Sequence, residues 1–288
     1  MDNAAEMTIS SIAAGAGERT ANDFFRQLLS APLRRGAIGL LLLGLLGGSA
    51  SASQPGAVLD YEVRYGPLQI MAVRTTARFD GDQYEAGTDV RTVGVVALLF
   101  PWSAASSANG VRVDGDLRPL RFRATGEYRG QRRLAELDYD SVAGVRAHVE
   151  PSAEEDDRDP VPPALQEATI DPLTASLTAV ASCRGTLHVF DGRRRYDLAI
   201  TDLGEAETPA ARHALYSGRA RHCRAAIHPL AGFWRPGTRD DQPPTQIDCW
   251  LAAPRPGFIA VPVYLELSAP RGTFSVALSA AELAPAGH

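Results

Sequence analysis

The chain has 288 residues, of which 45% are hydrophobic and 22% charged, and its formal net charge is −5. These values are typical of globular proteins and exclude disordered and collagen-like chains. The excess of acid argues against nucleic acid as a partner, because phosphate binding needs a basic surface. All 29 basic residues are arginine. Together with abundant Ala, Gly and Pro, this indicates a GC-rich genome rather than guanidinium chemistry.

Residues 34–52, RRGAIGLLLLGLLGGSASA, have the parts of a secretory signal peptide. Two arginines precede the apolar run 37–46, which is too short for a stable transmembrane anchor. Small residues at 50–52 predict cleavage after Ala52. We therefore expect residues 1–52 to be an N-terminal extension and signal peptide, and the mature protein to reside in the periplasm. An uncleaved anchor is the alternative, and no cysteine follows the run to carry a lipid.

From Ala57 onward, short runs alternate apolar and polar residues and are enriched in Tyr, Val and Thr. This period of two is typical of half-buried β-strands. Turns such as Asp80-Gly81-Asp82 separate the runs, because tight hairpins favour residues that tolerate positive φ. The strands expected in the first half are 58–65, 68–79, 83–92, 106–114, 118–129, 132–140 and 144–150.

The segment 151–165 interrupts this pattern with an acidic cluster and four prolines, so we expect an exposed loop. Calcium binding is its functional alternative, although the acids lack the spacing and turn glycine of a calcium loop. The acidic residues are Glu154, Glu155, Asp156, Asp157 and Asp159.

Two short helices are expected. Asp171 suits an N-cap and Pro172 the first helical position, and apolar residues then recur at helical spacing up to Val180. The apolar run 94–102 is either a short helix or a buried strand edge, ended by Pro101. The remaining strands are expected at 185–191, 194–204, 213–228, 246–253, 258–269 and 272–283.

No linker divides residues 53–288, which predicts a single β-rich domain. We expect a mainly β fold, an antiparallel open barrel or half-barrel with one or two short helices, because long meandering strands must close or curl to hide their edges.

Several stretches, in chain order, resemble an exported bacterial family known as domain of unknown function 3108. They are YEVRYG, GDQYEAG, GVVALLFPW, DPLTA, CRGTLHVFDGRRRYDL, YSGRARHC, PLAGF and IAVPVYLEL. The resemblance implies a periplasmic location and a fold like the open half-barrels of lipoprotein carriers. It implies no activity, so no catalytic residue is carried over.

Three cysteines in an oxidising compartment allow three pairings. Cys183 lies at the end of the expected helix, and Cys223 lies in a strand one hairpin later. Cys249 falls between Ile247 and Leu251 on the apolar face of its strand. This favours a Cys183–Cys223 bridge with a buried thiol at position 249. A catalytic thiol is disfavoured, because none of the three stands in a CxxC motif or beside an obvious base.

Two other clusters suggest chemistry. His213, His222, Cys223 and His228 suggest zinc, but residues 222 and 228 lie roughly 20 Å apart along a strand, so we expect no metal or other cofactor. Arginines crowd two hairpins, at 129–133 and 193–195. We interpret them as solvated turns, with contact to anionic lipid head groups as the functional alternative.

We expect a non-enzymatic envelope protein that binds a lipid or another apolar component, or that acts as a scaffold for envelope integrity. Peripheral contact with the membrane fits this expectation. An open barrel has a concave face whose aromatic side chains could line an apolar site, and ordinary core packing is the alternative. The alternative function is hydrolysis of envelope glycans or lipids, which needs a polar constellation that the sequence does not assemble. The candidate apolar-site residues are Phe100, Trp102, Phe233, Trp234 and Trp250.

Overall fold

Thirteen antiparallel strands form one sheet in the computed structural model, which describes residues 54–128, 131–142, 144–234, 246–269 and 272–284. The expected signal peptide at 1–52 therefore lies outside the described residues. The strands are β1 (Gln54–Tyr65), β2 (Leu68–Asp80), β3 (Gln83–Thr92), β4 (Ser103–Val113), β5 (Asp116–Tyr128), β6 (Gln131–Asp140), β7 (Gly144–Glu150), β8 (Gly185–Phe190), β9 (Arg195–Glu207), β10 (Arg219–Ala231), β11 (Gln246–Ala252), β12 (Val261–Ala269) and β13 (Gly272–Ala284). The helices are α3 (Gly94–Leu99), α4 (Pro163–Gln166) and α5 (Pro172–Ser182).

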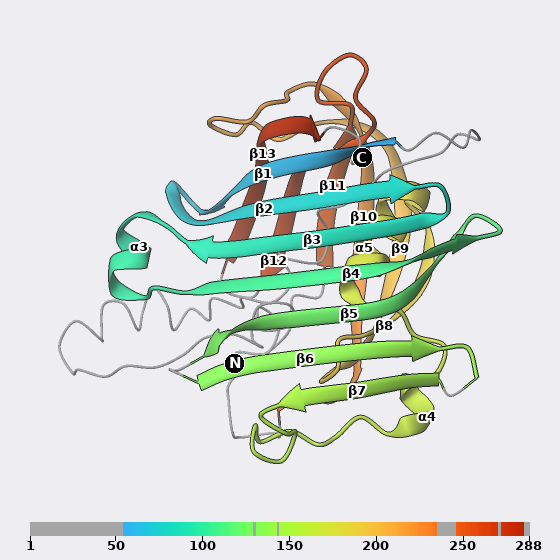
Figure 1. Cartoon of the computed structure of the whole chain (residues 1–288). Coiled ribbons are helices and arrows are strands. Elements are labelled where there is room, and N and C mark those ends of the chain that lie inside the picture. Colours follow the sequence, from blue (N-terminus) through green and yellow to red (C-terminus); the bar gives the residue numbers. More distant parts are fainter. Residues whose placement is uncertain (1–53, 129–130, 143, 235–245, 270–271, 285–288) are drawn as a thin grey trace.

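The strand order is β7-β6-β5-β4-β3-β2-β1-β13-β12-β11-β10-β9-β8, so all neighbouring strands are sequential except β1 and β13, and the sequential strands β7 and β8 end the sheet. The first half of the sheet, β1–β7, crosses the second half at a steep angle, and α5 lies between them (Figure 1). The expected mainly β, open-barrel fold is confirmed. Curling in this way hides most strand edges, because only β7 and β8 end the sheet.

Helix α5 begins and ends where the sequence predicts. The Asp171 carboxylate accepts hydrogen bonds from the backbone N–H groups of Leu173 (2.9 Å) and Thr174 (3.0 Å), and Pro172 occupies the first turn. Cys183 ends the helix in the left-handed conformation, with φ 53°. The strong cap matters because this helix is placed inside the barrel, where an unsatisfied N–H has no water to bind.

Most residues of α5 are buried, including the polar ones. The helix contacts β3, β4 and β5 on one side and β8 on the other. Its small residues let the two sheet halves approach closely, and its hydroxyls are satisfied locally. Ser176 donates to the carbonyl of Pro172 (2.9 Å), and Thr174 bonds to the Tyr84 hydroxyl (2.6 Å). The barrel interior is thus filled by the chain's own helix.

The two edge strands are joined by the turn between β8 and β9. Asp191 accepts from the N–H of Arg193 (2.9 Å), which folds the turn inward. The Arg193 guanidinium then donates to the carbonyls of Leu134 (3.0 Å), Glu150 (2.6 Å) and Pro151 (2.7 Å). A side chain from the β8 edge therefore holds the β6–β7 edge.

A buried ionic cluster lies beside this contact. Asp156 forms ion pairs with Arg133 and with Arg158 (2.7 Å), and Arg193 lies 3.9 Å from the same carboxylate. The Arg158 guanidinium stacks 3.8 Å above the ring of Trp234. We call Arg133, Asp156, Arg158 and Arg193 the arginine clasp.

The clasp corrects two expectations. The segment 151–165 is not simply an exposed loop, because Asp156 and Arg158 are buried. The arginines at 193–195 are not solvated, and Arg133 is buried as well, whereas Arg132 is exposed and Arg129 lies outside the described residues. Charge at a hairpin normally indicates solvent, but here backbone carbonyls and the carboxylates of Asp156, Asp191 and Asp197 replace the water.

The strand expected at 213–228 begins only at Arg219. Before it, the N–H of Thr208 donates to the carbonyl of Gly218 (2.9 Å), which closes a loop, and His213 adopts a left-handed conformation with φ 60°. The apolar run 94–102 forms the short helix α3, one of its two expected structures. Within the described residues, no helix is both long and apolar enough to span a bilayer.

Candidate functional site

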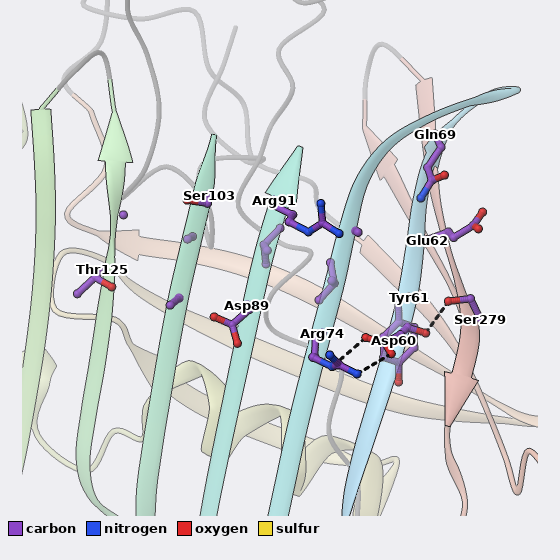
Figure 2. A pocket seen from close by; sticks show the side chains of 16 residues that line it. Asp60, Tyr61, Glu62, Gln69, Arg74, Asp89, Arg91, Ser103, Thr125 and Ser279 are labelled. Atoms are coloured by element: carbon purple, nitrogen blue, oxygen red, sulfur yellow. Dashed lines mark hydrogen bonds and ion pairs between the residues drawn. The ribbon is translucent and has the colours of Figure 1, made fainter. Parts of the chain in front are cut away.

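A hollow of about 650 Å³ lies on the solvent-facing side of the first half of the sheet (Figure 2). Its lining comes from β1–β5 and from one residue of β13. The lining residues that carry charge or hydroxyl groups are Asp60, Tyr61, Glu62, Arg74, Asp89, Arg91, Ser103, Thr125 and Ser279.

Strand register explains how these residues meet. Asp60 pairs with Arg74, Arg74 with Asp89, and Asp89 with Ala105, so one row crosses four strands. Alternation places this row on the solvent side, while Val73 and Val90 face the core. Ala72 and Ala105 also line the hollow, and their small side chains leave room beside the charged ones.

The charges of the hollow are only partly paired. Arg74 lies 3.2 Å from Asp60, and both side chains are well exposed, so this pair contributes little to stability. Across the rest of the row, no described ion pair engages Asp89 or Arg91. These two groups, of opposite sign and two residues apart on β3, are therefore available to a ligand.

A second hollow of about 520 Å³ lies further along the same strands. Gly87 forms part of its floor, and a Cβ there would lie 2.9 Å from the Thr76 hydroxyl. We call the two hollows together the exposed trough. The sequence signal of the trough is a set of small residues on the polar faces of neighbouring strands, and it was not recognised as a site. These residues are Ala72, Gly87, Ala105 and Ser107.

Among the described residues, the hollow beside α5 in the interior is much smaller. The hollow between α5 and the second half of the sheet, lined by residues that include Val180, Cys223 and Cys249, has a volume of about 10 Å³. That is about the space of one water molecule and far below the 300–1,000 Å³ of ordinary ligand pockets. The apolar face that the alternation predicts is present, but it is packed against α5.

The five aromatic residues expected at the mouth of a cavity lie in different surroundings. Trp102 is buried at the start of β4, and Trp234 is buried against Arg158 of the clasp. Trp250 is buried on β11, while Phe100 and Phe233 are half-buried. These placements match the alternative of ordinary packing, and a charged residue at Trp102 or Trp234 would disrupt the fold.

An acid–base pair lies on the outer face of the second half of the sheet. His222 Nε2 lies 2.7 Å from Asp248 Oδ1, and its ring stacks on Trp250 with a centroid distance of 4.3 Å. Asp248 also accepts from Arg224 (2.9 Å) and Gln246 (2.6 Å). These donors lower the pKa of Asp248 despite its partial burial. A carboxylate held by three donors is typical of a structural network.

The cysteines are arranged as expected. Cys183 and Cys223 form a disulfide that joins the end of α5 to β10, and Cys249 is free and buried. Burial raises the pKa of the Cys249 thiol, which keeps it protonated and unreactive. Cys223 is in the disulfide and His222 is bound to Asp248, so two of the four suggested zinc ligands are otherwise engaged. Among the described residues, no group of three acidic, histidine or cysteine side chains could hold a metal.

The fold and its surfaces define a class: an antiparallel, barrel-like sheet wrapped around its own helix. A family model described as "Protein of unknown function (DUF3108)" matches residues 60–279, so the chain belongs to this family. No curated protein matches. One similar solved structure is the β-barrel-like DUF1849 protein from Brucella abortus, with 11% identity, a TM-score of 0.43, and coverage of 81% of this chain and 99% of that one.

Proposed function

We propose that the protein is an exported, non-enzymatic component of the bacterial cell envelope, which acts as a scaffold for envelope integrity and contacts its partner through the exposed trough. The observation that carries this proposal is the filled interior. Because α5 occupies the space in which a carrier would hold an acyl chain, binding has to occur on the outside of the barrel.

The lining of the trough favours a polar partner. Asp89 and Arg91 present opposite charges, and Ser103 and Thr125 add hydroxyls beside them. A partner that carries both charges and hydroxyl groups satisfies such a surface, whereas an acyl chain would leave the charges desolvated and unpaired. A lipid or other apolar component of the envelope would have to bind elsewhere on the molecule.

Hydrolysis remains the alternative class of function. The His222–Asp248 pair is the acid–base arrangement that comes closest to supporting it. A hydrolase of the serine type would also need a nucleophile within hydrogen-bond reach of the histidine. Among the described residues, Asp248 is the one hydrogen-bond partner of the His222 ring and no hydroxyl or thiol bonds its other nitrogen, which supports a structural role.

The trough is tested by exchanging its charges in the bacterium that produces the protein. Cells lacking the protein should become sensitive to detergent, and the wild-type gene should restore resistance. The exchange Asp89→Arg with Arg91→Asp keeps the net charge and the burial pattern, and it should fail to restore resistance. The matched exchange Arg121→Asp with Asp138→Arg, at an exposed ion pair (2.9 Å) on β5 and β6, should restore it fully. If the deletion causes no sensitivity, or both exchanges restore resistance, the proposal is wrong.

The proposed periplasmic location of the protein is tested in a separate experiment. The protein recovered from the periplasm should begin near Ser53, the residue that follows the expected cleavage site. N-terminal sequencing of that fraction gives the answer. A start at Met1 or Met7 in the membrane fraction would show that the apolar segment anchors the chain.

A further inference from the structure

The connection between β3 and β4 presents apolar side chains to solvent. Residues 93–102, VGVVALLFPW, contain no charge, and the helix α3 within them projects from one end of the sheet (Figure 1). Val95 is 47% exposed, Leu98 83% and Leu99 44%. We call Val95, Leu98 and Leu99 the α3 tip. Large apolar side chains held together in water are the mark of an interaction surface.

The tip is held firmly by its base. The N–H of Val93 donates to the carbonyl of Ile70 (3.1 Å). The Thr92 hydroxyl donates to the carbonyl of Phe100 (2.9 Å) and accepts from the N–H of Trp102 (3.0 Å). Val96 and Trp102 are buried. Exposure of the tip is therefore a property of a well-bonded loop, and binding requires little ordering of the chain.

The size and surroundings of the tip identify its partner. A stable protein interface takes about 20–30 residues on each side, and three side chains on a six-residue helix provide far fewer. Binding to a bilayer interface scales with the apolar area that is inserted and with attraction to anionic lipids, so a small uncharged tip beside a basic group supports a shallow, reversible contact. The exposed side chain of Arg91, next to the tip on β3, supplies that group.

We propose that the α3 tip docks the protein on a lipid bilayer, with Val95, Leu98 and Leu99 inserted between the head groups and Arg91 near their phosphates. The α3 tip itself lies outside the exposed trough, whereas Arg91 belongs to the trough lining as well. The proposed envelope location brings a membrane within reach, but vesicle binding can be measured without relying on that location.

The test uses the mature protein purified from the bacterium that produces it, with vesicles of phosphatidylethanolamine and phosphatidylglycerol. The wild type should float with the vesicles, and Leu98→Asp should weaken binding by at least about tenfold, since a fully buried leucine contributes more than the equivalent free energy. Val142→Asp is the matched control, because Val142 is 94% exposed in the turn after β6 at the opposite end of the sheet (Figure 1). It should bind as the wild type does.

A second measurement reports insertion directly. None of the three cysteines presents an exposed thiol, because two form the disulfide and Cys249 is buried. Leu98→Cys therefore takes up an environment-sensitive fluorophore at one site, and its emission should shift to the blue on vesicles, whereas Val142→Cys should show no shift. If the wild type does not bind, if Leu98→Asp binds equally well, or if both labels respond alike, the inference is overturned. A periplasmic protein that ignores vesicles would overturn this inference and leave the proposed scaffold standing.

Discussion

The Arg193 guanidinium donates a hydrogen bond of 2.6 Å to the backbone carbonyl of Glu150, a residue 43 positions earlier in the chain. Arg193 belongs to the turn after β8, and Glu150 is the last residue of β7, so this bond joins the two strands that end the sheet. Without Arg193, the carbonyls of Leu134, Glu150 and Pro151 at the β6–β7 edge would lose this donor. The clasp therefore closes a sheet whose strand pairing alone leaves it open.

Loss of Arg193 should destabilise the fold strongly. Arg193→Ala removes hydrogen bonds to three carbonyls at once, and we expect the free energy of unfolding to fall by about 3 kcal/mol or more, as for buried bonds to a charged group. Denaturant titration measures the change. Arg132→Ala, at an exposed arginine of β6, should change it by less than about 0.5 kcal/mol. Equal effects of the two variants would show that the clasp contributes nothing.

The negative charge of Asp156 should be required for stability, because buried arginines surround it. Burial by itself raises the pKa of its carboxyl, but Arg158 and Arg133 outweigh this and hold the pKa below its ordinary value. Asp156→Asn should cost about 3–5 kcal/mol of stability, because it leaves buried guanidinium groups without a counter-charge. The control is Asp157→Asn at the exposed neighbour. A stable Asp156→Asn protein would mean that the carbonyl contacts alone satisfy the arginines.

The helix cap should make stability depend on pH. Burial raises the pKa of Asp171 from 3.8 to about 6, although the hydrogen bonds from Thr174 and Leu173 act in the opposite direction. The folded protein then binds more protons than the unfolded chain between about pH 4 and 6, so this contribution to stability is complete at low pH and declines as pH rises through 6. Asp171→Asn keeps a capping side chain but does not titrate.

The difference in unfolding free energy between wild type and Asp171→Asn isolates this group from the other acids. Relative to the variant, the wild type should lose up to about 3 kcal/mol between pH 4 and 7, which corresponds to a pKa shift of about two units. Parallel pH profiles for the two proteins would indicate that Asp171 keeps an ordinary pKa.

The disulfide should be found by peptide mapping without reduction, as a bridge between Cys183 and Cys223. It closes a loop with a sequence separation of 40 residues, so its removal should lower stability by roughly 4 kcal/mol in the chain-entropy model. Reduction of the wild type and replacement of both Cys183 and Cys223 by alanine should lower the free energy of unfolding by similar amounts. Cys249 lies directly opposite Cys223 in the sheet, and a mapped Cys223–Cys249 bridge would contradict the assignment.

Local sequence signals were sufficient for most elements, although β10 begins only at Arg219 and the short helix α4 was not predicted. Alternation and turn residues predicted β3 and β7 at their observed bounds, and Asp171 and Pro172 predicted the start of α5. The cysteine pairing was predicted from the position of Cys183 at the end of the helix and of Cys249 on the apolar face of its strand. These features depend on neighbours in the chain, which periodicity reports well.

Contacts between distant segments could not be predicted in this way. A run such as Arg193–Arg195 has the composition of a solvated turn, and only the closure of the barrel buries it against carbonyls of β6 and β7. The same holds for α5, most of whose residues are buried in the space where a cavity was expected. The exposed trough was missed because its signal, small residues on a polar strand face, is weak in any one strand.

Native mass spectrometry tests most directly whether the interior is filled by α5. It compares the mature wild-type protein, purified from the bacterium that produces it, with its Leu98→Asp variant. We expect the variant to show the mass of the mature polypeptide with one disulfide and no lipid, because any lipid held by the α3 tip should be lost with Leu98. One molecule of acyl lipid per chain that persists in Leu98→Asp would contradict a barrel filled by its own helix and would restore the role of a carrier.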